Sequence, residues 1–255
     1  MNSVYPDRWH PVFMLIDALQ ALGASVEFAR DARTGGAWGF VCNGRACAWF
    51  IDNRHAHEMV RDDPAAKFLL ENGGLVMHAQ PPDRDRVGGK WLPLAASPGY
   101  KVPPRPMQKL WDCAFVGFIR TEARADFLSD ISARYSLSSA SGLFGEQAVA
   151  TYWQARVGLN VPTSWGGATG YDSANMRCFE VLATGVPLVT AYEKWLDELG
   201  LIPGVNYVPY ATIPEAIAAV KFAIEHPDIG DKGAQLAQAR HTYKHRALQV
   251  LEWLA

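Results

Sequence analysis

The spacing of apolar residues in the first hundred positions predicts strands and helices in alternation. Between residues 9 and 22 apolar side chains recur every three or four positions, which is the spacing of one helix face, and Gly23 ends the pattern. Asn43-Gly44 is typical of a two-residue hairpin turn, and apolar-rich stretches flank it on both sides. The predicted elements of this part are helices at 9–22 and 54–70 and strands at 25–29, 38–42, 46–51, 75–79 and 90–95.

The same alternation resumes after a proline-rich stretch. Residues 97–109 contain four prolines, which lack the backbone N–H that a sheet interior requires, so this stretch predicts a stiff linker. Residues 113–117 form an apolar run that ends in glycine, which is typical of a buried strand. Further strands are expected at 157–161, 186–189 and 207–210, and helices at 122–135, 147–156, from 175 onward, 213–225 and 235–254.

Two such halves predict an α/β protein made of two Rossmann-like domains that face a cleft. A chain of 255 residues is long enough for one large domain or for two, and the linker favours two. We expect a compact first domain at 1–100, a proline-rich linker at 101–110, a second domain at 111–240 and a terminal helix at 241–255.

Composition narrows the class of protein. Apolar residues make up 49% of the chain and charged residues 20%, which is typical of a soluble globular protein. The net charge of −2 gives no overall basic field for nucleic acid, although a local basic groove is compatible with it. No stretch has the roughly 18–20 apolar residues of a membrane span, and the polar N-terminus lacks a signal-peptide core. We therefore expect a cytoplasmic protein.

The four cysteines show neither a disulfide pattern nor a metal-binding one. Across the predicted hairpin turn, Cys42 and Cys47 do not face each other. Cys113 and Cys178 lie in apolar runs, where a free cysteine behaves as a small hydrophobic residue. We expect free thiols and no zinc site.

The helix expected from residue 175 carries two charged residues among apolar ones. Arg177 and Glu180 interrupt its apolar positions, and the helix follows the strand at 157–161, so it begins at the carboxyl edge of the sheet. A helix N-terminus and an arginine suit a diphosphate, and a glutamate can accept hydrogen bonds from the hydroxyls of a ribose. The pair therefore suggests a nucleotide-sugar site. The alternative is that the two side chains, three residues apart, pair with each other on the helix surface.

Four stretches resemble, in order and spacing, glycosyltransferases of the GT-B fold, especially the spore-maturation-protein (CgeB-like) branch of group 1. NMRCFEVLATGVPLVT, which starts at Asn175, resembles the helix–turn–strand signature of that branch. The other three are DCAFVGFIR at 112–120, GVNYVPYATIPEAIAAVKFAIEHPD at 204–228 and HTYKHRALQVL at 241–251. KWLPLAASP at 90–98 resembles the strand that leads into the interdomain linker. The resemblance covers residues 90–255 well and residues 1–89 loosely.

The resemblance implies transfer of a sugar from a nucleotide-sugar donor, with UDP among the candidate nucleotides. The second half would hold the donor, the first half the acceptor, and the last helix would return to the first domain. Glu180 would bind the ribose or adjoining sugar hydroxyls, while Arg177, Gly117 and Arg120 would face the diphosphate. Trp165, in a glycine-rich loop, would stack on a sugar or else anchor the loop. The donor-binding residues implied are Gly117, Arg120, Phe144, Trp165, Asp172, Asn175, Met176, Arg177 and Glu180.

The departing nucleoside diphosphate develops negative charge, which arginines and a helix dipole would stabilise, so we expect no metal and no other cofactor. Asp172 stands where many retaining members carry a glutamate, which leaves open whether the reaction retains or inverts the anomeric configuration. An inverting reaction needs a base that faces the acceptor hydroxyl. Our catalytic candidates are Arg177, Glu180 and Asp52, and the other possible bases in the first half are His10, His55, His57 and His78.

Asp83-Arg84-Asp85 is a competing pattern. An Asp-x-Asp after a strand is how metal-dependent, single-domain (GT-A) glycosyltransferases hold a divalent cation. Here the tripeptide lies in a loop rich in proline and arginine, which is typical of a solvated turn. Dependence of activity on a metal distinguishes the two possibilities.

The short first half implies an open acceptor side and therefore a large acceptor, such as a saccharide, a protein or a lipid. DNA with hydroxylated bases, as in small phage-type sugar transferases, is an alternative that the acidic net charge disfavours. Cations nonetheless gather in the first half and the linker, at Arg45, Arg54, Arg61, Lys67, Arg84, Arg86, Lys90, Lys101 and Arg105. Two other classes stay open, a non-catalytic nucleotide-sugar-binding module and a nucleotide-sugar epimerase or hydrolase.

Overall fold

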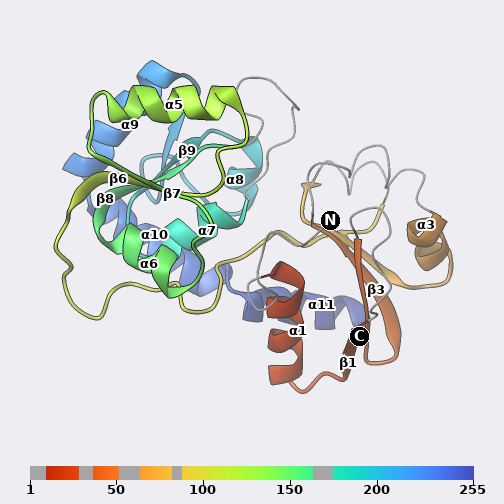
Figure 1. The fold of residues 1–255 in the computed structure, drawn as a ribbon. Helices are drawn as coiled ribbons and strands as arrows, with labels where there is room; N and C mark the ends of the chain where they lie inside the picture. The colour runs from red at the N-terminus through yellow and green to blue at the C-terminus, as the bar shows by residue number, and fades with distance from the viewer. Residues whose placement is uncertain (1–9, 29–36, 52–63, 82–87, 163–174) are drawn as a thin grey trace. The chain divides into compact units, whose positions relative to one another are not determined.

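The computed structural model describes residues 10–28, 37–51, 64–81, 88–162 and 175–255. The chain divides into two compact units, one formed by Met1–Ala95 with Thr242–Ala255 and the other by Ala96–His241. Each unit is a sheet with helices packed on it (Figure 1), which confirms the α/β class with two Rossmann-like parts. The segment 96–110, which includes the expected linker, belongs to the second unit.

The first unit is built on a five-stranded mixed sheet with the strand order β1-β2-β3-β4-β5. The first two strand pairs are antiparallel and the last two are parallel. Helices α1 and α11 pack against each other within this unit. The bounds are β1 Val26–Phe28, β2 Ala37–Cys42, β3 Arg45–Phe50, β4 Leu75–His78, β5 Lys90–Trp91, α1 Pro11–Ala21, α3 Pro64–Glu71 and α11 Tyr243–Leu254.

The hairpin between β2 and β3 follows the sequence prediction. Asn43 and Gly44 have φ values of 50° and 79°, the left-handed conformation that this two-residue turn requires. Cys42 pairs with Arg45 in the ladder, so it does not face Cys47. All four cysteines are free and buried, as expected.

The last helix is fixed to the first unit near both of its ends. Close to its start, the buried Arg246 donates from Nε to the Pro93 carbonyl at 2.8 Å and from Nη2 to the Leu94 carbonyl at 3.0 Å. At its end, Arg45 Nη1 donates to the Leu254 carbonyl at 3.1 Å. These bonds agree with the expected return of the C-terminal helix to the first domain.

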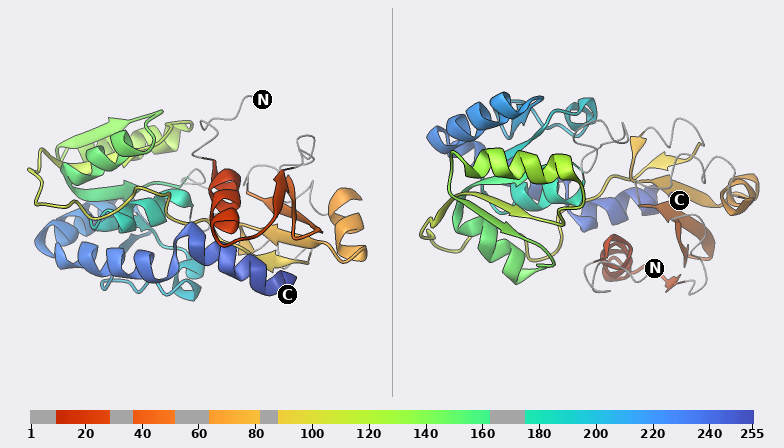
Figure 2. Two further views of the ribbon diagram at one scale, coloured as in Figure 1. Left: turned by 90° about the horizontal axis from the view of Figure 1, so that it is seen from below. Right: turned by 45° about the horizontal axis from the view of Figure 1, so that its top comes forward.

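The second unit has a five-stranded, all-parallel sheet with the strand order β10-β9-β8-β6-β7. Helices α5 and α9 cover one face, and α6, α7 and α10 cover the other (Figures 1 and 2). The bounds are β6 Trp111–Val116, β7 Leu137–Ala140, β8 Ala155–Asn160, β9 Leu188–Ala191, β10 Val208–Tyr210, α5 Glu122–Ser132, α6 Glu146–Trp153, α7 Met176–Ala183, α8 Lys194–Glu198, α9 Ile213–Glu225 and α10 Asp228–Arg240.

The two faces of this sheet pack differently. On the α5 and α9 face, buried side chains such as Phe115, Phe127 and Leu159 form a continuous apolar core. On the other face Gly158 of β8 lies against α7, and any side chain there would overlap Val181. The missing side chain lets α7 lie close to the sheet, which brings its first turn to the end of β8.

Several elements differ from the sequence predictions, and one of them is the short helix α8, which was not predicted. The strand β7 was not predicted, because it is a partly exposed edge strand with two serines and lacks an apolar run. The strand expected at 90–95 is shorter, since only Lys90 and Trp91 join the sheet. The single helix expected at 235–254 is wrong: the chain forms α10 and α11, which are separated at 241–242. The Thr242 side chain caps α11 by accepting from the His245 N–H.

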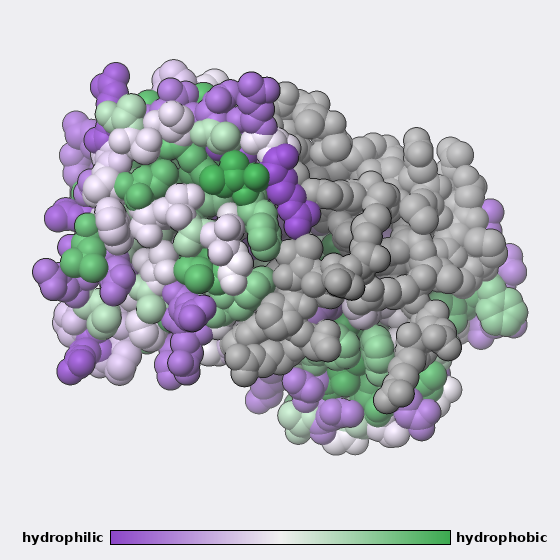
Figure 3. Space-filling view, in the orientation of Figure 1, coloured by the Kyte–Doolittle hydropathy of each residue, from purple (hydrophilic) through white to green (hydrophobic). Residues whose placement is uncertain are grey.

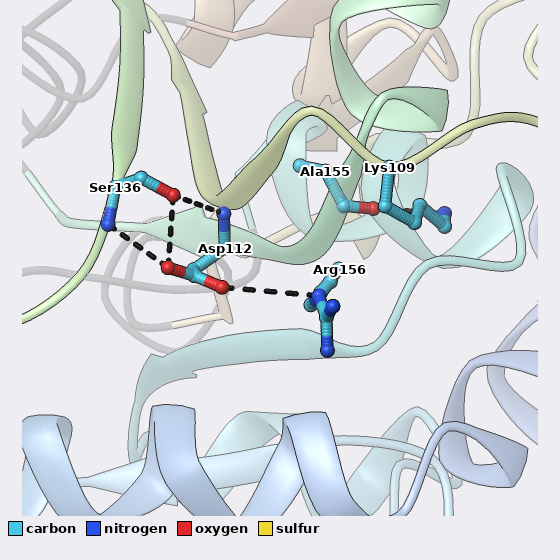
Figure 4. A network of polar contacts seen from close by, with 5 residues as sticks. All are labelled: Lys109, Asp112, Ser136, Ala155 and Arg156. Carbon is cyan, nitrogen blue, oxygen red and sulfur yellow. Dashed lines mark hydrogen bonds and ion pairs between the residues drawn. The ribbon is translucent and has the colours of Figure 1, made fainter.

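At the amino edge of the second sheet, Asp112 joins neighbouring strands (Figure 4). Its carboxylate accepts from the hydroxyl and the N–H of Ser136 at 2.8 and 3.0 Å, and it lies 3.8 Å from Arg156 Nε. Lys109 Nζ donates to the Ala155 carbonyl at 2.8 Å. These polar groups are engaged with one another and with the backbone, so this edge of the sheet is structural.

The face of the second unit seen in Figure 3 has apolar residues toward its middle and hydrophilic residues around its rim. The exposed apolar side chains of this unit include Leu110, Ile119 and Tyr192. Within the described ranges, no helix combines the length and the hydropathy that crossing a bilayer needs.

Candidate functional site

The candidate site lies at the carboxyl edge of the second sheet. Because all its strands are parallel, their carboxyl ends meet at one edge, where ligands bind in open α/β sheets. The strands β6, β8 and β9 bring Val116, Asn160 and Thr190 to this edge, and α7 adds Arg177 and Glu180.

The sequence of α7 explains its position. Asn175 has the extended backbone of an N-cap residue, and Gly185, with a φ of +74°, follows the last turn. Between them the apolar side chains are buried against the sheet and α10, while Arg177 and Glu180 are only partly buried. The helix therefore buries one face and presents its two charged residues at the sheet edge.

Arg177 connects the ends of two neighbouring strands. Its Nε donates to the Val116 carbonyl at 2.6 Å, and its Nη1 donates to Asn160 Oδ1 at 2.8 Å. The guanidinium carbon lies 4.7 Å from the centre of the Phe115 ring, a distance that suits a cation–π contact. None of the described residues accepts a hydrogen bond from Nη2. Among the described residues the cation is thus held by neutral groups, and the two N–H groups of Nη2 have no acceptor there.

Gly117 lies directly against this guanidinium. A Cβ atom at this position would overlap Arg177 Nη2. The Gly117 N–H donates to the Ala140 carbonyl at 2.8 Å, which fixes the backbone where β6 ends and the loop to α5 begins. We predicted a glycine that approaches a diphosphate, and the structure adds a reason for it: the arginine occupies the space of a side chain.

Asn160 is the centre of the polar contacts. Besides the bond from Arg177, its Oδ1 accepts from Asn175 Nδ2 at 3.0 Å. Its Nδ2 donates to Thr190 Oγ1 at 2.9 Å and to Cys178 Sγ at 3.2 Å, and its carbonyl accepts from the Tyr210 hydroxyl at 2.9 Å. These bonds connect β6, β8, β9 and β10 along the carboxyl edge.

Asn175 contributes an acceptor that the described part of the chain does not use. Its Oδ1 is buried, and none of the described residues donates a hydrogen bond to it. A buried acceptor without a donor is costly, which favours binding of a ligand that supplies a hydroxyl or an N–H.

Glu180 binds hydroxyl groups of the segment that follows residue 95. Its Oε1 accepts from Ser97 Oγ at 2.7 Å, and the Tyr100 hydroxyl interacts with the same carboxyl group. Burial raises the pKa of Glu180 to about 7, although the Ser97 hydroxyl, the Arg177 charge and the Tyr100 hydroxyl all favour its ionised form. Within the described part of the chain, no ion pair shorter than 4.0 Å joins it to Arg177. The alternative of a simple surface pair is therefore wrong.

The other predicted donor-binding residues do not take part in the hydrogen bonds around Asn160 described above. Met176 is buried, and its sulfur lies 3.8 Å from Ser97 Oγ. Arg120 is exposed, with its guanidinium 5.1 Å from the centre of the Phe118 ring. Phe144 is partly buried in the turn before α6. Trp165 and Asp172 lie outside the described residues.

Of the possible bases in the first unit, the structure describes His10 and His78. His10 is the N-cap of α1, where its Nδ1 accepts from the Val12 N–H at 3.3 Å. His78 is buried, its Nε2 bonds to the Gly88 carbonyl at 2.9 Å, and burial lowers its pKa to about 4. The other candidates, Asp52, His55, His57, Asp83 and Asp85, lie outside the described residues.

Three residues of the site escaped sequence reasoning: Asn160, Ser97 and Tyr100. An asparagine directly after the apolar run 157–159 was the available indication for Asn160, because a polar group at the end of a strand lies at the carboxyl edge. Ser97 and Tyr100 stand in the proline-rich stretch, eighty or more residues from Glu180. No local pattern connects them with α7.

The arrangement is suited to an anion beside a hydroxyl-rich group. Arg177 offers N–H donors that no described residue accepts, Glu180 offers acceptors on the same helix, and Asn175 offers one at its N-cap. Among the described residues no cluster of three or more His, Cys, Asp or Glu side chains is present, and metal independence stays a prediction.

Comparison with known protein families gives one match that spans more than half of the chain. The family model described as glycosyl transferase-like matches residues 120–252, which include the carboxyl edge of β8 and the whole of α7. A search of curated proteins finds no match.

Several solved structures share the fold. A glycosyltransferase involved in avilamycin A biosynthesis, AviGT4, has a TM-score of 0.51 at 15% identity, with 70% of this chain and 61% of that chain covered. TarM has a TM-score of 0.52 at 9% identity, with 80% and 48% covered. The pneumococcal O-GlcNAc transferase GtfA, in complex with UDP and GlcNAc, has a TM-score of 0.50 at 11% identity, with 90% and 51% covered.

The chain thus spans about half to three fifths of the length of these structures. At such identities the likeness shows the fold alone.

Proposed function

Because the chain belongs to the glycosyl transferase-like family, we propose that it transfers a sugar from a nucleotide-sugar donor to a hydroxyl group of an acceptor. The second unit binds the donor at the carboxyl edge of its sheet. The motif at 175–190 supports placement in the spore-maturation-protein (CgeB-like) branch of the GT-B glycosyltransferases, and we propose a small member of phage type.

The observation that carries the proposal is the setting of Arg177. Its guanidinium is anchored through Nε and Nη1 to neutral acceptors, and no described carboxylate pairs with it. A fixed cation whose Nη2 group has no acceptor among the described residues, at a ligand-binding edge, suits the diphosphate of a nucleotide sugar. During transfer the diphosphate gains negative charge, and Arg177 and the first turn of α7 stabilise it without a metal.

Glu180 and Asn175 recognise the hydroxyl groups of the donor. Ser97 and Tyr100 contact the Glu180 carboxyl group, which still has acceptor capacity because each carboxylate can accept about four hydrogen bonds. The unused Oδ1 of Asn175 provides a second acceptor close by. Uridine diphosphate sugars are the first donors to test, since a structural neighbour is a transferase in complex with UDP.

We propose a large acceptor, either a saccharide, a protein or a lipid, that meets the donor in the cytoplasm. DNA with hydroxylated bases is the second candidate, favoured by the cations of the first half, and Asp52 is the proposed base of an inverting reaction. A non-catalytic module would bind the donor and leave it intact. Incubation with labelled nucleotide sugars separates transfer from hydrolysis, epimerisation and binding alone.

Substitution of the two charged residues of α7 tests the donor site. We expect Glu180→Ala to weaken nucleotide-sugar binding about ten- to a hundredfold, because hydrogen bonds to a charged group contribute roughly 1.5–3 kcal/mol. Arg177→Ala should weaken the nucleoside diphosphate and the nucleotide sugar similarly but leave the free nucleoside almost unaffected. Calorimetric titration of each variant with all three ligands measures these effects.

The controls are the exposed residues Glu225, at the end of α9, and Arg134, just after α5, whose replacement by alanine removes the same charges within the same unit but away from the carboxyl edge. Circular dichroism checks that each variant is folded. Unchanged donor affinity in a folded Glu180→Ala protein would contradict the proposed hydroxyl contact.

A further inference from the structure

Asn160 has a role that neither the sequence motif nor the family assigns. We propose that Asn160 is a positioning residue that holds Arg177 through a neutral acceptor and so keeps the arginine charge available for the donor diphosphate. This inference rests on the proposed function, because it concerns the same ligand.

The hydrogen bonds determine the orientation of the Asn160 amide. Its oxygen faces the Arg177 Nη1 and Asn175 Nδ2 groups at 2.8 and 3.0 Å, and a guanidinium can only donate. Its NH2 group therefore faces the Thr190 hydroxyl and the Cys178 sulfur. The side chain is 2% exposed, so its four contacts are protected from water. The amide cannot turn without losing the bond to Arg177.

The neutrality of this amide is the second part of the inference. A partly buried arginine is usually paired with a carboxylate. Among the described residues, the groups that hold Arg177 are instead two oxygens without charge and an aromatic ring. The Glu180 carboxylate interacts with Arg177 electrostatically, and its Oε1 accepts from Ser97 Oγ at 2.7 Å. An aspartate at position 160 would hold the guanidinium equally well but would neutralise it.

Asn160→Asp separates these two roles, because the two side chains have the same shape. The carboxylate keeps the acceptor for Arg177, and the Thr190 hydroxyl and the Cys178 thiol can rotate to donate to its second oxygen. We expect the variant to fold with a melting temperature no lower than that of the wild type. Its affinity for UDP and for pyrophosphate should fall at least about tenfold, as expected when an ion pair competes for the arginine, while uridine binding stays unchanged.

Asn160→Ala is the second variant and removes the acceptor without adding charge. We expect UDP affinity to decrease in the order wild type, Asn160→Ala, Asn160→Asp. If Asn160 only held Arg177 in place and its neutrality did not matter, Asn160→Asp would bind UDP more tightly than Asn160→Ala. Gln235→Glu, an exposed amide-to-carboxylate change on α10, is the control for the added charge.

The outcomes distinguish this inference from the proposed function. If the wild type binds UDP and Asn160→Asp binds it equally well, the role of Asn160 is overturned and the donor site stands. If the wild type binds pyrophosphate but no nucleotide or nucleotide sugar, and Asn160→Asp loses that binding, the role of Asn160 stands and the proposed function falls. Absence of all anion binding by the wild type overturns both.

Discussion

At the scale of single residues, the donor site depends on how neutral and charged groups are paired. Arg177 is held by a carbonyl and an amide, and Glu180 is held by a hydroxyl, so the two opposite charges do not neutralise each other. Each side chain keeps hydrogen-bonding capacity that no described residue uses. An asparagine faces Arg177 because its amide oxygen accepts a hydrogen bond without adding charge. Gly117 lies beside the arginine because a side chain there would overlap the guanidinium.

The pKa of Glu180 predicts how stability depends on pH. Burial raises this pKa to about 7 in the folded protein, against an ordinary value of 4.5. Between these two values the unfolded chain releases the proton while the folded protein retains it, so the unfolded state binds fewer protons and the free energy of unfolding falls as pH rises. The contribution is fully present below about pH 4.5 and is lost above about pH 7.

Glu180→Gln provides the test, because the amide has nearly the same shape and does not titrate. We expect the stability of the wild type relative to this variant to decrease steadily from pH 4.5 to 7. Urea unfolding of both proteins across this range measures the difference. A difference that stays constant with pH would show that the carboxyl group titrates normally.

At the scale of secondary-structure elements, the position of α7 depends on close packing with α10. Two glycines of α10 face it: a side chain at Gly230 would overlap the Gly185 carbonyl, and one at Gly233 would lie 2.6 Å from Leu182 Cδ2. Both helices therefore approach each other at backbone distance. Since α7 carries Arg177 and Glu180, this contact determines where the site residues lie.

Gly230→Ala tests this packing. Alanine favours a helix over glycine by about 1 kcal/mol, yet here the added methyl group meets backbone atoms that cannot move aside. We expect a net loss of about 1–3 kcal/mol in the free energy of unfolding, the usual effect of overpacking. Thermal or urea unfolding measures it, with the exposed Gln235→Ala on the same helix as the control. Stability equal to the wild type would mean that α10 can shift away from α7.

At the scale of the whole molecule, the chain forms two α/β units and passes between them at two points. The first crossing follows Ala95 and the second follows His241. Within the second unit the two points are adjacent, because the Ala96 N–H donates to the His241 carbonyl at 2.9 Å. The break between α10 and α11 lies at the second crossing point. The chain therefore leaves the second unit after α10, and α11 belongs to the first unit.

Metal independence is a prediction about the activity of the molecule as a whole. We expect sugar transfer to continue after dialysis against EDTA, because Arg177 and the first turn of α7 provide the positive charge that a cation would otherwise supply. The measurement is transfer from a labelled nucleotide sugar before and after chelation, with melting temperatures as the check on folding. Loss of activity that manganese restores would instead favour the Asp83 and Asp85 pattern.

The sequence by itself determined the elements whose local pattern is strong. The Asn43-Gly44 turn, the apolar face of α7 and the alternation of strands and helices follow from backbone preferences and from spacing along the chain. The same reasoning placed Arg177 and Glu180 at a sheet edge, since a helix that follows a parallel strand begins there.

Only the tertiary structure decided which groups hold these two side chains. Asn160, Ser97 and Val116 contact α7 from 17 to 83 residues away in the chain, and such contacts leave no periodic signal in the sequence. The division of the predicted last helix into α10 and α11 was equally hidden, because both pieces are amphipathic and it is packing that assigns them to different units. Local preferences thus specify the elements, and long-range contacts specify the site.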